Sequence, residues 1–239
     1  MEESNVNVQA SDEVSYDTLL KSKVLLQNRE QTIIKQISDI IDTELERAGR
    51  EDFSILEVGY GDGNRFRRLS NNYKSVKFTG LEVRQKPVDD MVALGYDCRL
   101  VEAELFNEFF GSDETFDIIY GFGVIHHMSD PYKSLESLIG LLKPGGVIVF
   151  FREHHKYDLL SHLYARMKGN WVYEKNTLKV KRKSFKELLG KYTKDYSVKY
   201  DNNTLSMCFT RFNSVFCKLK LNRVPFWSGL TIYAKMEKK

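Results

Sequence analysis

The chain has 239 residues, of which 42% are hydrophobic and 29% charged, as expected of one sizeable globular domain. It contains no run of 18 apolar residues, and its acidic, polar start is unlike a secretory signal, so we expect no membrane span and a cytoplasmic protein. Three cysteines without a CxxC pair favour neither a disulfide framework nor a zinc site.

Charge is unevenly distributed along the chain. The net charge is +3, but residues 168–239 contribute +12 and residues 1–167 contribute −9. A basic C-terminal third is typical of a protein with an anionic substrate or partner, and equally of a solvated lysine-rich surface. The charge pattern alone leaves both interpretations open.

The N-terminal region divides into two parts. Residues 1–15 are polar and acidic, and we expect them to be disordered. Residues 17–49 carry apolar positions at helical spacing, which predicts one or two helices ending near Ala48.

From residue 53 onward, short apolar runs alternate with helical patterns. The runs predict strands at 55–58, 76–81, 100–101, 116–120 and 146–151, and the patterns between them predict helices at 65–72, 88–94 and 132–142. Apolar runs without polar alternation, each followed by a helix, are typical of a parallel sheet covered on both faces. With right-handed crossovers, these elements form a doubly wound α/β sheet.

Beyond residue 151 the pattern is less regular. It predicts helices at 158–167 and 184–192 and closing strands at 196–200 and 230–236. The predicted fold is therefore a Rossmann-like, mostly parallel sheet of seven strands. Its core covers residues 53–151, and residues 152–239 supply a capping insertion after strand five and the closing strands of the same domain.

A glycine-rich loop follows the first strand, in the stretch "SILEVGYGDGN". Glycines at alternate positions 59, 61 and 63 let the backbone approach a ligand and point amides of the next helix at it. Glu57 and Asp62 stand in the same stretch, where their negative charge would repel a pyrophosphate. The spacing also departs from the dinucleotide motif GxGxxG, because Asn64 stands next to the last glycine.

Two further acids suggest an adenosine ligand. Glu82 closes the second strand, where a carboxylate can accept both ribose hydroxyls, and Glu102 follows the third strand, where it can accept an adenine amino group. Dinucleotides and S-adenosylmethionine both contain adenosine. The acidic loop favours S-adenosylmethionine, which has one carboxylate but also an ammonium and a sulfonium.

At this point the chain resembles the class I S-adenosylmethionine-dependent methyltransferases. The resemblance covers residues 53–151 and rests on "ILEVGYGDG", Glu82, "VEAEL", "FDIIYGFGVIHHMSDP" and "LLKPGGVIVF". It implies that Glu57 and the glycine loop hold the methionine portion, Glu82 the ribose, and Glu102 with Ala103 the adenine. The full set of cofactor-binding residues that we expect is Glu57, Gly59, Tyr60, Gly61, Gly63, Glu82, Val83, Glu102, Ala103 and Gly121.

The resemblance also bears on the N-terminal region and on the loop. Members of this family often carry an N-terminal lid, so we assign residues 16–52 to such helices, with Tyr16 as a candidate lid residue. Tyr60 and Asp62 replace the small residues more usual in the loop.

Histidines follow the fourth and fifth strands. Methyl transfer is an in-line displacement, which needs a base only when the acceptor must lose a proton, as a hydroxyl does. His126, His154 and His155 are the candidate bases, whereas His127 is expected mainly to fix the packing of its loop. No HxH or HExxH spacing is present, so we expect no metal site.

Three functions remain in view. The leading hypothesis is methylation, at oxygen, of a small-molecule, glycan or lipid-linked acceptor, because no (D/N)PP(Y/F) motif of exocyclic-amine methylation follows the fourth strand. The second is an RNA or protein methyltransferase that grips an anionic polymer with its basic C-terminal third. The third is a non-catalytic partner subunit that keeps the fold.

Overall fold

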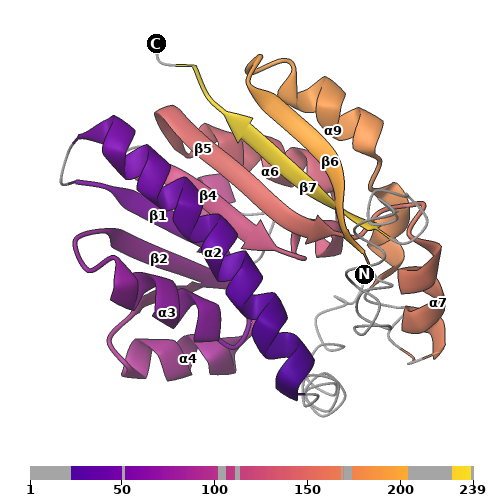
Figure 1. Cartoon of the computed structure of the whole chain (residues 1–239), viewed down its shortest axis with the longest axis horizontal. Helices are drawn as coiled ribbons and strands as arrows, with labels where there is room; N and C mark the ends of the chain where they lie inside the picture. The colour runs from indigo at the N-terminus through magenta and orange to yellow at the C-terminus, as the bar shows by residue number, and fades with distance from the viewer. Residues whose placement is uncertain are drawn as a thin grey trace, which may run out of the picture.

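The computed structural model describes residues 23–49, 52–101, 106–110, 114–167, 169, 174–203 and 228–237. A seven-stranded sheet with the order β3-β2-β1-β4-β5-β7-β6 forms its centre (Figure 1). The strands are β1 Ser54–Val58, β2 Lys77–Glu82, β3 Asp97–Leu100, β4 Phe116–Phe122, β5 Leu142–Glu153, β6 Tyr196–Asn203 and β7 Ser228–Lys235. Only β7 runs antiparallel to its neighbours, so the predicted doubly wound, mostly parallel sheet is confirmed.

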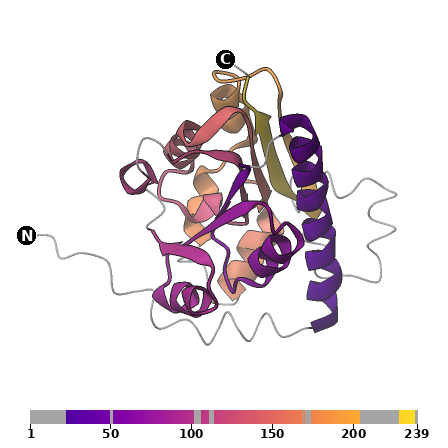
Figure 2. The same ribbon diagram turned by 90° about the vertical axis from the view of Figure 1, so that its left-hand side faces the viewer.

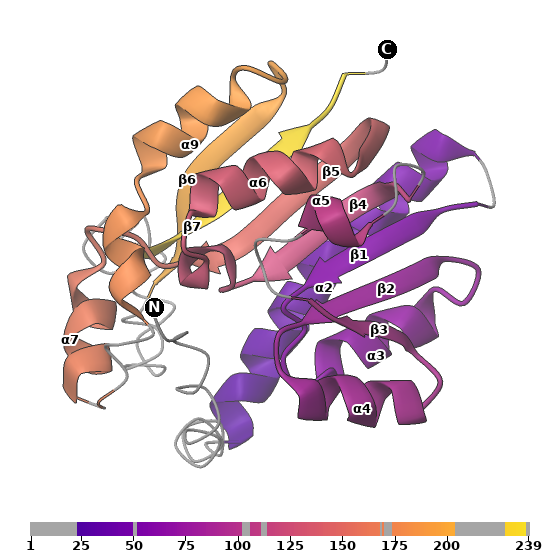
Figure 3. The ribbon, with the colours of Figure 1, turned by 180° about the vertical axis from the view of Figure 1, so that it is seen from behind.

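Helices cover both faces of the sheet. They are α2 Lys23–Ala48, α3 Asn64–Asn72, α4 Gln85–Ala93, α5 Phe106–Phe109, α6 Pro131–Gly140, α7 Leu159–Met167 and α9 Arg182–Leu189, with short 3-10 turns η2 Ile125–His127 and η3 Lys175–Lys179. Helix α2 lies along one face (Figure 2), and α5, α6 and α9 lie on the other (Figure 3). A hydrophobic core lies on each face of the sheet, and β4 contributes to both. Ile118 packs in the core under α2, and Ile119 packs in the core under α6.

The third strand lies earlier than the sequence predicts. We expected it at 100–101, but β3 is Asp97–Leu100 and pairs only with β2. In this edge strand, buried Cys98 stands between half-buried Asp97 and Arg99. It therefore lacks the continuous apolar run by which the central strands are recognised.

The fifth strand also starts earlier than predicted. Leu142 pairs with Phe116 and Val147 with Ile118, so the residues between Leu142 and Val147 bulge out of the ladder. Residues 143–145, which lie between the predicted helix and the predicted strand, thus belong to a bulge inside β5, with Gly145 at a φ of 80°.

The described part of the N-terminal region is a core helix. Ile33, Ile37 and Ile41 of α2 are buried against the sheet at helical spacing. Glu44, one turn further, accepts two hydrogen bonds from Lys235 Nζ of β7 (2.6 and 2.9 Å). Tyr16 lies outside the described residues, so the lid stays a prediction. No helix among those described has the length and hydropathy that crossing a membrane requires.

We predict that Glu44→Gln lowers the free energy of unfolding by about 1–3 kcal/mol, because Lys235 keeps its charge in a largely buried place without its carboxylate partner. Urea denaturation measures this. The matched control is Asp39→Asn on the same helix, whose pair with Lys35 is exposed, so its effect is about 0–1 kcal/mol. Equal losses in the two variants would contradict a tether between α2 and β7.

Candidate functional site

The candidate residues gather where β1, β2, β4 and β5 end. The chain continues from β1 to β2 on one side, while β4 pairs with β1 on the other, so the strand order reverses between them. Open α/β sheets bind ligands at such a switch point. At this edge, the glycine loop follows β1, Glu82 ends β2, His126 and His127 follow β4, and Glu153 ends β5.

Hydrogen bonds to β2 hold the glycine loop. The Gly59 N–H donates to Leu81 O (2.8 Å), and the Gly61 N–H donates to Glu82 Oε2 (2.9 Å). Gly59, Gly61 and Gly63 have φ values of 68°, 67° and 74°, which side chains rarely adopt. A Cβ placed on Gly61 would meet nothing within 4 Å, so the backbone lies open at the centre of the loop.

Both loop acids have partners within the protein. Glu57 is fully buried, accepts a hydrogen bond from Tyr120 Oη (2.6 Å) and pairs with Arg65 (Nη2 to Oε1, 2.9 Å). Asp62 is exposed and accepts from the Asn64 N–H (3.1 Å). A contact between Glu57 and a ligand ammonium would therefore require Arg65 to move.

Glu82 is the best-placed of the expected cofactor residues. Its Oε1 accepts from the N–H groups of Val83 (3.1 Å) and Arg84 (3.3 Å) and from Arg84 Nε (3.1 Å). Its Oε2 accepts from the Gly61 N–H alone among the described residues. Because a carboxylate oxygen has two acceptor positions, Oε2 keeps one for a further donor.

The remaining cofactor candidates lie in different environments. The Tyr60 ring is buried in the core, and only its backbone lines the loop. Val83 is 41% exposed at the end of β2, an apolar side chain open to a ligand. Gly121 is close-packed, since a Cβ there would lie 2.5 Å from the Phe150 ring. Glu102 and Ala103 lie outside the described residues.

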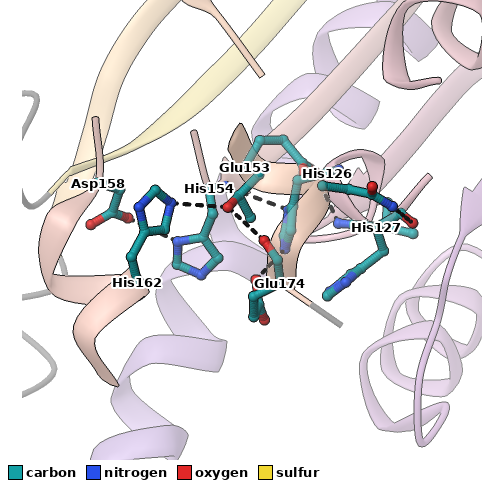
Figure 4. Close-up of polar contacts among 10 residues, drawn as sticks. His126, His127, Glu153, His154, Asp158, His162 and Glu174 are labelled. Atoms are coloured by element: carbon teal, nitrogen blue, oxygen red, sulfur yellow. Dashed lines mark hydrogen bonds and ion pairs between the residues drawn. The ribbon is translucent and has the colours of Figure 1, made fainter. Parts of the chain in front are cut away.

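A buried carboxylate joins the ends of β4 and β5 (Figure 4). Glu153 Oε1 accepts from the Val124 N–H (3.0 Å), and Oε2 accepts from the His126 N–H (3.1 Å). Glu153 Oε2 also lies 2.7 Å from His126 Nδ1. The His154 N–H also lies 3.4 Å from Nδ1, a long contact beside the 2.7 Å pair with Glu153. We therefore assign the proton to His126 Nδ1, which donates it to Glu153, and this leaves a lone pair on Nε2.

Burial sets the protonation of this pair. It raises the pKa of Glu153 to about 7, against the opposing effect of the backbone N–H donors. Burial also holds the pKa of His126 well below its usual value, with smaller contributions from His127 and His154. His126 is therefore a neutral ring at pH 7, able to accept a proton or to coordinate an ion.

The other histidines differ in what their ring nitrogens contact. His154 Nδ1 lies 2.8 Å from Asp158 Oδ2, and its side chain is 29% exposed. Burial opposes the charged form of His154, but Asp158, Glu174 and Glu153 together outweigh it, so the pKa of His154 is raised. His155 is buried, and its Nε2 lies 2.8 Å from Ser228 O while its Nδ1 accepts from the Tyr157 N–H. His127 is exposed at the rim.

A family model described as a methyltransferase domain matches residues 27–192, which include the glycine loop, Glu82 and the histidine rim. The chain belongs to this methyltransferase family. The class I assignment expected from the sequence is thus confirmed, and S-adenosylmethionine is the methyl donor of that class.

Two curated relatives match parts of this methyltransferase. The ubiquinone biosynthesis O-methyltransferase of Parvibaculum lavamentivorans is 29% identical over 126 residues, covering 51% of this chain and 48% of the relative. The tRNA N(3)-methylcytidine methyltransferase trm140 of Schizosaccharomyces pombe is 27% identical over 158 residues, covering 60% and 48%. The chain thus matches about half the length of these relatives.

Solved methyltransferases share the fold over nearly the whole chain. The plantazolicin methyltransferase BpumL, in complex with SAH, has a TM-score of 0.64 at 14% identity and covers 97% of this chain and 92% of its own. At such low identity the likeness establishes the fold alone.

Sequence reasoning missed three residues of this site. Arg65 lies in the first turn of the helix after the loop, but its pairing with Glu57 depends on how that helix packs. Glu153 directly precedes His154 in the sequence, but its bonds to the loop after β4 depend on the β4–β5 pairing. Glu174 comes from the segment after α7, and no local pattern connects it with His126.

We predict that Gly59→Ala lowers the free energy of unfolding by about 1–3 kcal/mol more than Gly61→Ala. Both substitutions strain a left-handed backbone, but a Cβ on Gly59 would also lie 2.5 Å from Val124 Cγ2. Urea denaturation of both variants measures the difference. Gly59→Ala in a Val124→Ala background provides the control, since removing that methyl abolishes the added loss. Equal effects of the two glycine variants would show that Val124 does not press on the loop.

Proposed function

We propose that the protein binds S-adenosylmethionine across the ends of β1, β2 and β3 and transfers its methyl group to a hydroxyl oxygen of a small-molecule, glycan or lipid-linked acceptor. One observation carries this proposal: a neutral, buried His126, held by Glu153 in the turn after β4, presents a ring nitrogen that makes no hydrogen bond to the described residues. Val124 connects this turn with the glycine loop, because it precedes the turn and packs on Gly59.

The residues present fit the cofactor. The open backbone at Gly61 offers space for the methionine portion, and Glu82 Oε2 keeps an acceptor position for a ribose hydroxyl. Exposed Val83 supplies an apolar surface next to that position. We propose that Glu57 acts indirectly, by holding Arg65 and Tyr120 beside the loop.

When bound, the cofactor supplies an electrophilic methyl group on a sulfonium leaving group. His126 Nε2 accepts the acceptor's hydroxyl proton, and the Nδ1–H donated to Glu153 keeps the ring in the orientation and tautomer for this task. The new C–O bond forms as the C–S bond breaks, and S-adenosylhomocysteine leaves. His154 is the second candidate base, whereas both nitrogens of His155 are engaged within the protein.

The exposed surface of helix α7 favours an acceptor that has an apolar part. Leu159, Leu163 and Met167 lie one turn apart on α7, and all three are more than half exposed. Asp158, just before this helix, bonds His154 of the rim, so the apolar stripe is near the reaction centre. The relative named as an O-methyltransferase agrees with transfer to oxygen.

The basic C-terminal third and the relative named as a tRNA methyltransferase keep RNA as a second candidate acceptor. A salt titration of RNA binding separates the two classes, because phosphate contacts weaken steeply as salt rises. No RNA binding at low salt would remove the RNA candidate. Labelled S-adenosylmethionine incubated with a metabolite extract then identifies the small acceptor by the label it gains.

We predict that Glu82→Gln weakens S-adenosylmethionine binding by about 10–100-fold, the loss expected for one charge-assisted hydrogen bond. Isothermal titration calorimetry measures the affinity, and thermal unfolding checks that the variant is folded. Asp62→Asn is the matched control, because Asp62 is exposed and caps Asn64, so its affinity stays near that of the wild type. An unchanged affinity in Glu82→Gln would contradict the ribose role. No binding by the wild-type protein would favour a non-catalytic subunit.

We predict that His126→Asn lowers turnover by about 10²–10⁴-fold while cofactor affinity stays nearly unchanged, because His126 serves the acceptor and not the cofactor. Turnover is measured as label transferred to the acceptor identified in the extract. His154→Asn provides the comparison. A larger loss in His154→Asn than in His126→Asn would transfer the role of base to His154.

A further inference from the structure

Three side chains at the rim bring metal-ligating atoms together. A ring nitrogen from His126, a ring nitrogen from His127 and a carboxylate oxygen of Glu174 all lie within 4.8 Å of one another. The two rings are tilted by 42° with their centroids 4.1 Å apart, and Glu174 Oε2 lies 3.6 Å from His126 Nε2. Figure 4 shows Glu153 and Glu174 on either side of the His126 ring.

The His126 nitrogen within this group has no hydrogen-bonding partner in the described part of the chain. The residue is 1% exposed, and its Nε2 makes no hydrogen bond to any described residue. The distance to Glu174 is too long for one, and a buried polar atom without a partner is unfavourable. An ion between Nε2 and Glu174 would supply that partner.

The surroundings of His126 match those of a metal ligand. Histidines that coordinate a metal through one nitrogen usually donate the other N–H to a carboxylate, which fixes the ring and raises its basicity. Glu153 does this for His126 at 2.7 Å, and it is itself fixed by the N–H groups of Val124 and His126. Glu153 thus keeps the Nε2 lone pair aimed at the position between His127 and Glu174.

Hydrogen bonds also fix the backbone at Glu174. Thr177 Oγ1 donates to Glu174 O (2.6 Å) and lies 2.9 Å from His162 Nε2. The turn η3 that follows is fixed against η2, because Asn176 Nδ2 donates to His127 O (3.2 Å). A second bond runs from Lys179 Nζ to Ser129 O (2.7 Å). These bonds keep the segments that carry His127 and Glu174 together.

We propose that His126, His127 and Glu174 form a binding site for one divalent transition-metal ion. Two imidazoles and one carboxylate suit Zn²⁺ or Fe²⁺, whereas Mg²⁺ and Ca²⁺ prefer sites built from oxygen alone. Three protein ligands leave at least one coordination position for a small oxygen ligand. The spacing rules applied to the sequence did not reveal this site, because its third ligand comes from a distant segment.

The site itself does not depend on methyl transfer, but its role in the reaction rests on the proposed function. With an ion bound, the Nε2 lone pair coordinates the ion and no longer accepts the acceptor's proton. The ion instead lowers the pKa of a hydroxyl that enters its open position. The hydroxyl then loses its proton to solvent water. Its oxygen forms the bond to the methyl carbon as the C–S bond breaks.

Metal titration without cofactor or acceptor tests the site. The full-length protein is first treated with a chelator and then titrated with Co²⁺, followed by visible absorption, and with Zn²⁺, followed by calorimetry. We expect one ion per chain, a Co²⁺ spectrum of low coordination number, and a raised thermal midpoint with either ion. His127→Ala and Glu174→Gln weaken binding by about 100-fold or more, since even partners outside the first coordination shell contribute about 10–100-fold.

The variants are chosen to stay folded, because the His127 and Glu174 side chains are not buried. The matched control is Glu187→Gln, which removes an exposed carboxylate of α9 and leaves binding unchanged. No uptake by the wild type, or equal uptake by all variants, would overturn the proposal. If the wild-type protein binds the metal ion but does not bind S-adenosylmethionine, the proposed function is overturned and the metal site is retained.

Discussion

The geometry of the rim depends on one buried carboxylate. Glu153 stands at the end of β5 and bonds two backbone N–H groups and a ring nitrogen of the turn after β4. Burial disfavours the charged form of the Glu153 carboxylate, and the hydrogen-bond donors around it offset part of this cost. The same bonds orient His126, bring His127 to the surface beside it and position both against the segment that carries Glu174. Without this carboxylate, strands β4 and β5 would still pair, but the turn after β4 would lose the contacts that orient the His126 ring.

The carboxylates near the glycine loop have partners within the protein, and these partners change the charge that a ligand meets. Two carboxylates beside a ligand loop indicate a ligand with positive charge. In the folded protein, Arg65 neutralises one of them, and its guanidinium also stacks on Phe122, 4.9 Å from the ring centroid. Glu82 is also paired with an arginine, Arg84, but its Oε2 accepts from the Gly61 N–H, so it contacts the loop directly.

Much of the fold follows from local pattern. The continuous apolar runs of β1, β4 and β5 reflect burial on both faces, and a glycine loop with an acid at the end of the next strand locates the edge that binds ligands. The predicted strand boundaries were wrong where that pattern weakens, as in β3 with its half-buried polar residues. At the site, sequence identified His126, but its partners Glu153 and Glu174 follow from strand pairing and from a turn far along the chain. His155 shows the same limit, since its bond to Ser228 exists only once β7 is in place.

The position of β7 has a consequence for how the chain assembles. β7 follows β6 in sequence yet lies between β5 and β6, and it also anchors the first described helix through Lys235. While a ribosome is still making the chain, β5 therefore presents a bare edge and β6 has no neighbour to join. Exposed edges of this kind recruit other chains, so the interval before β7 emerges is when the nascent protein most needs chaperone protection.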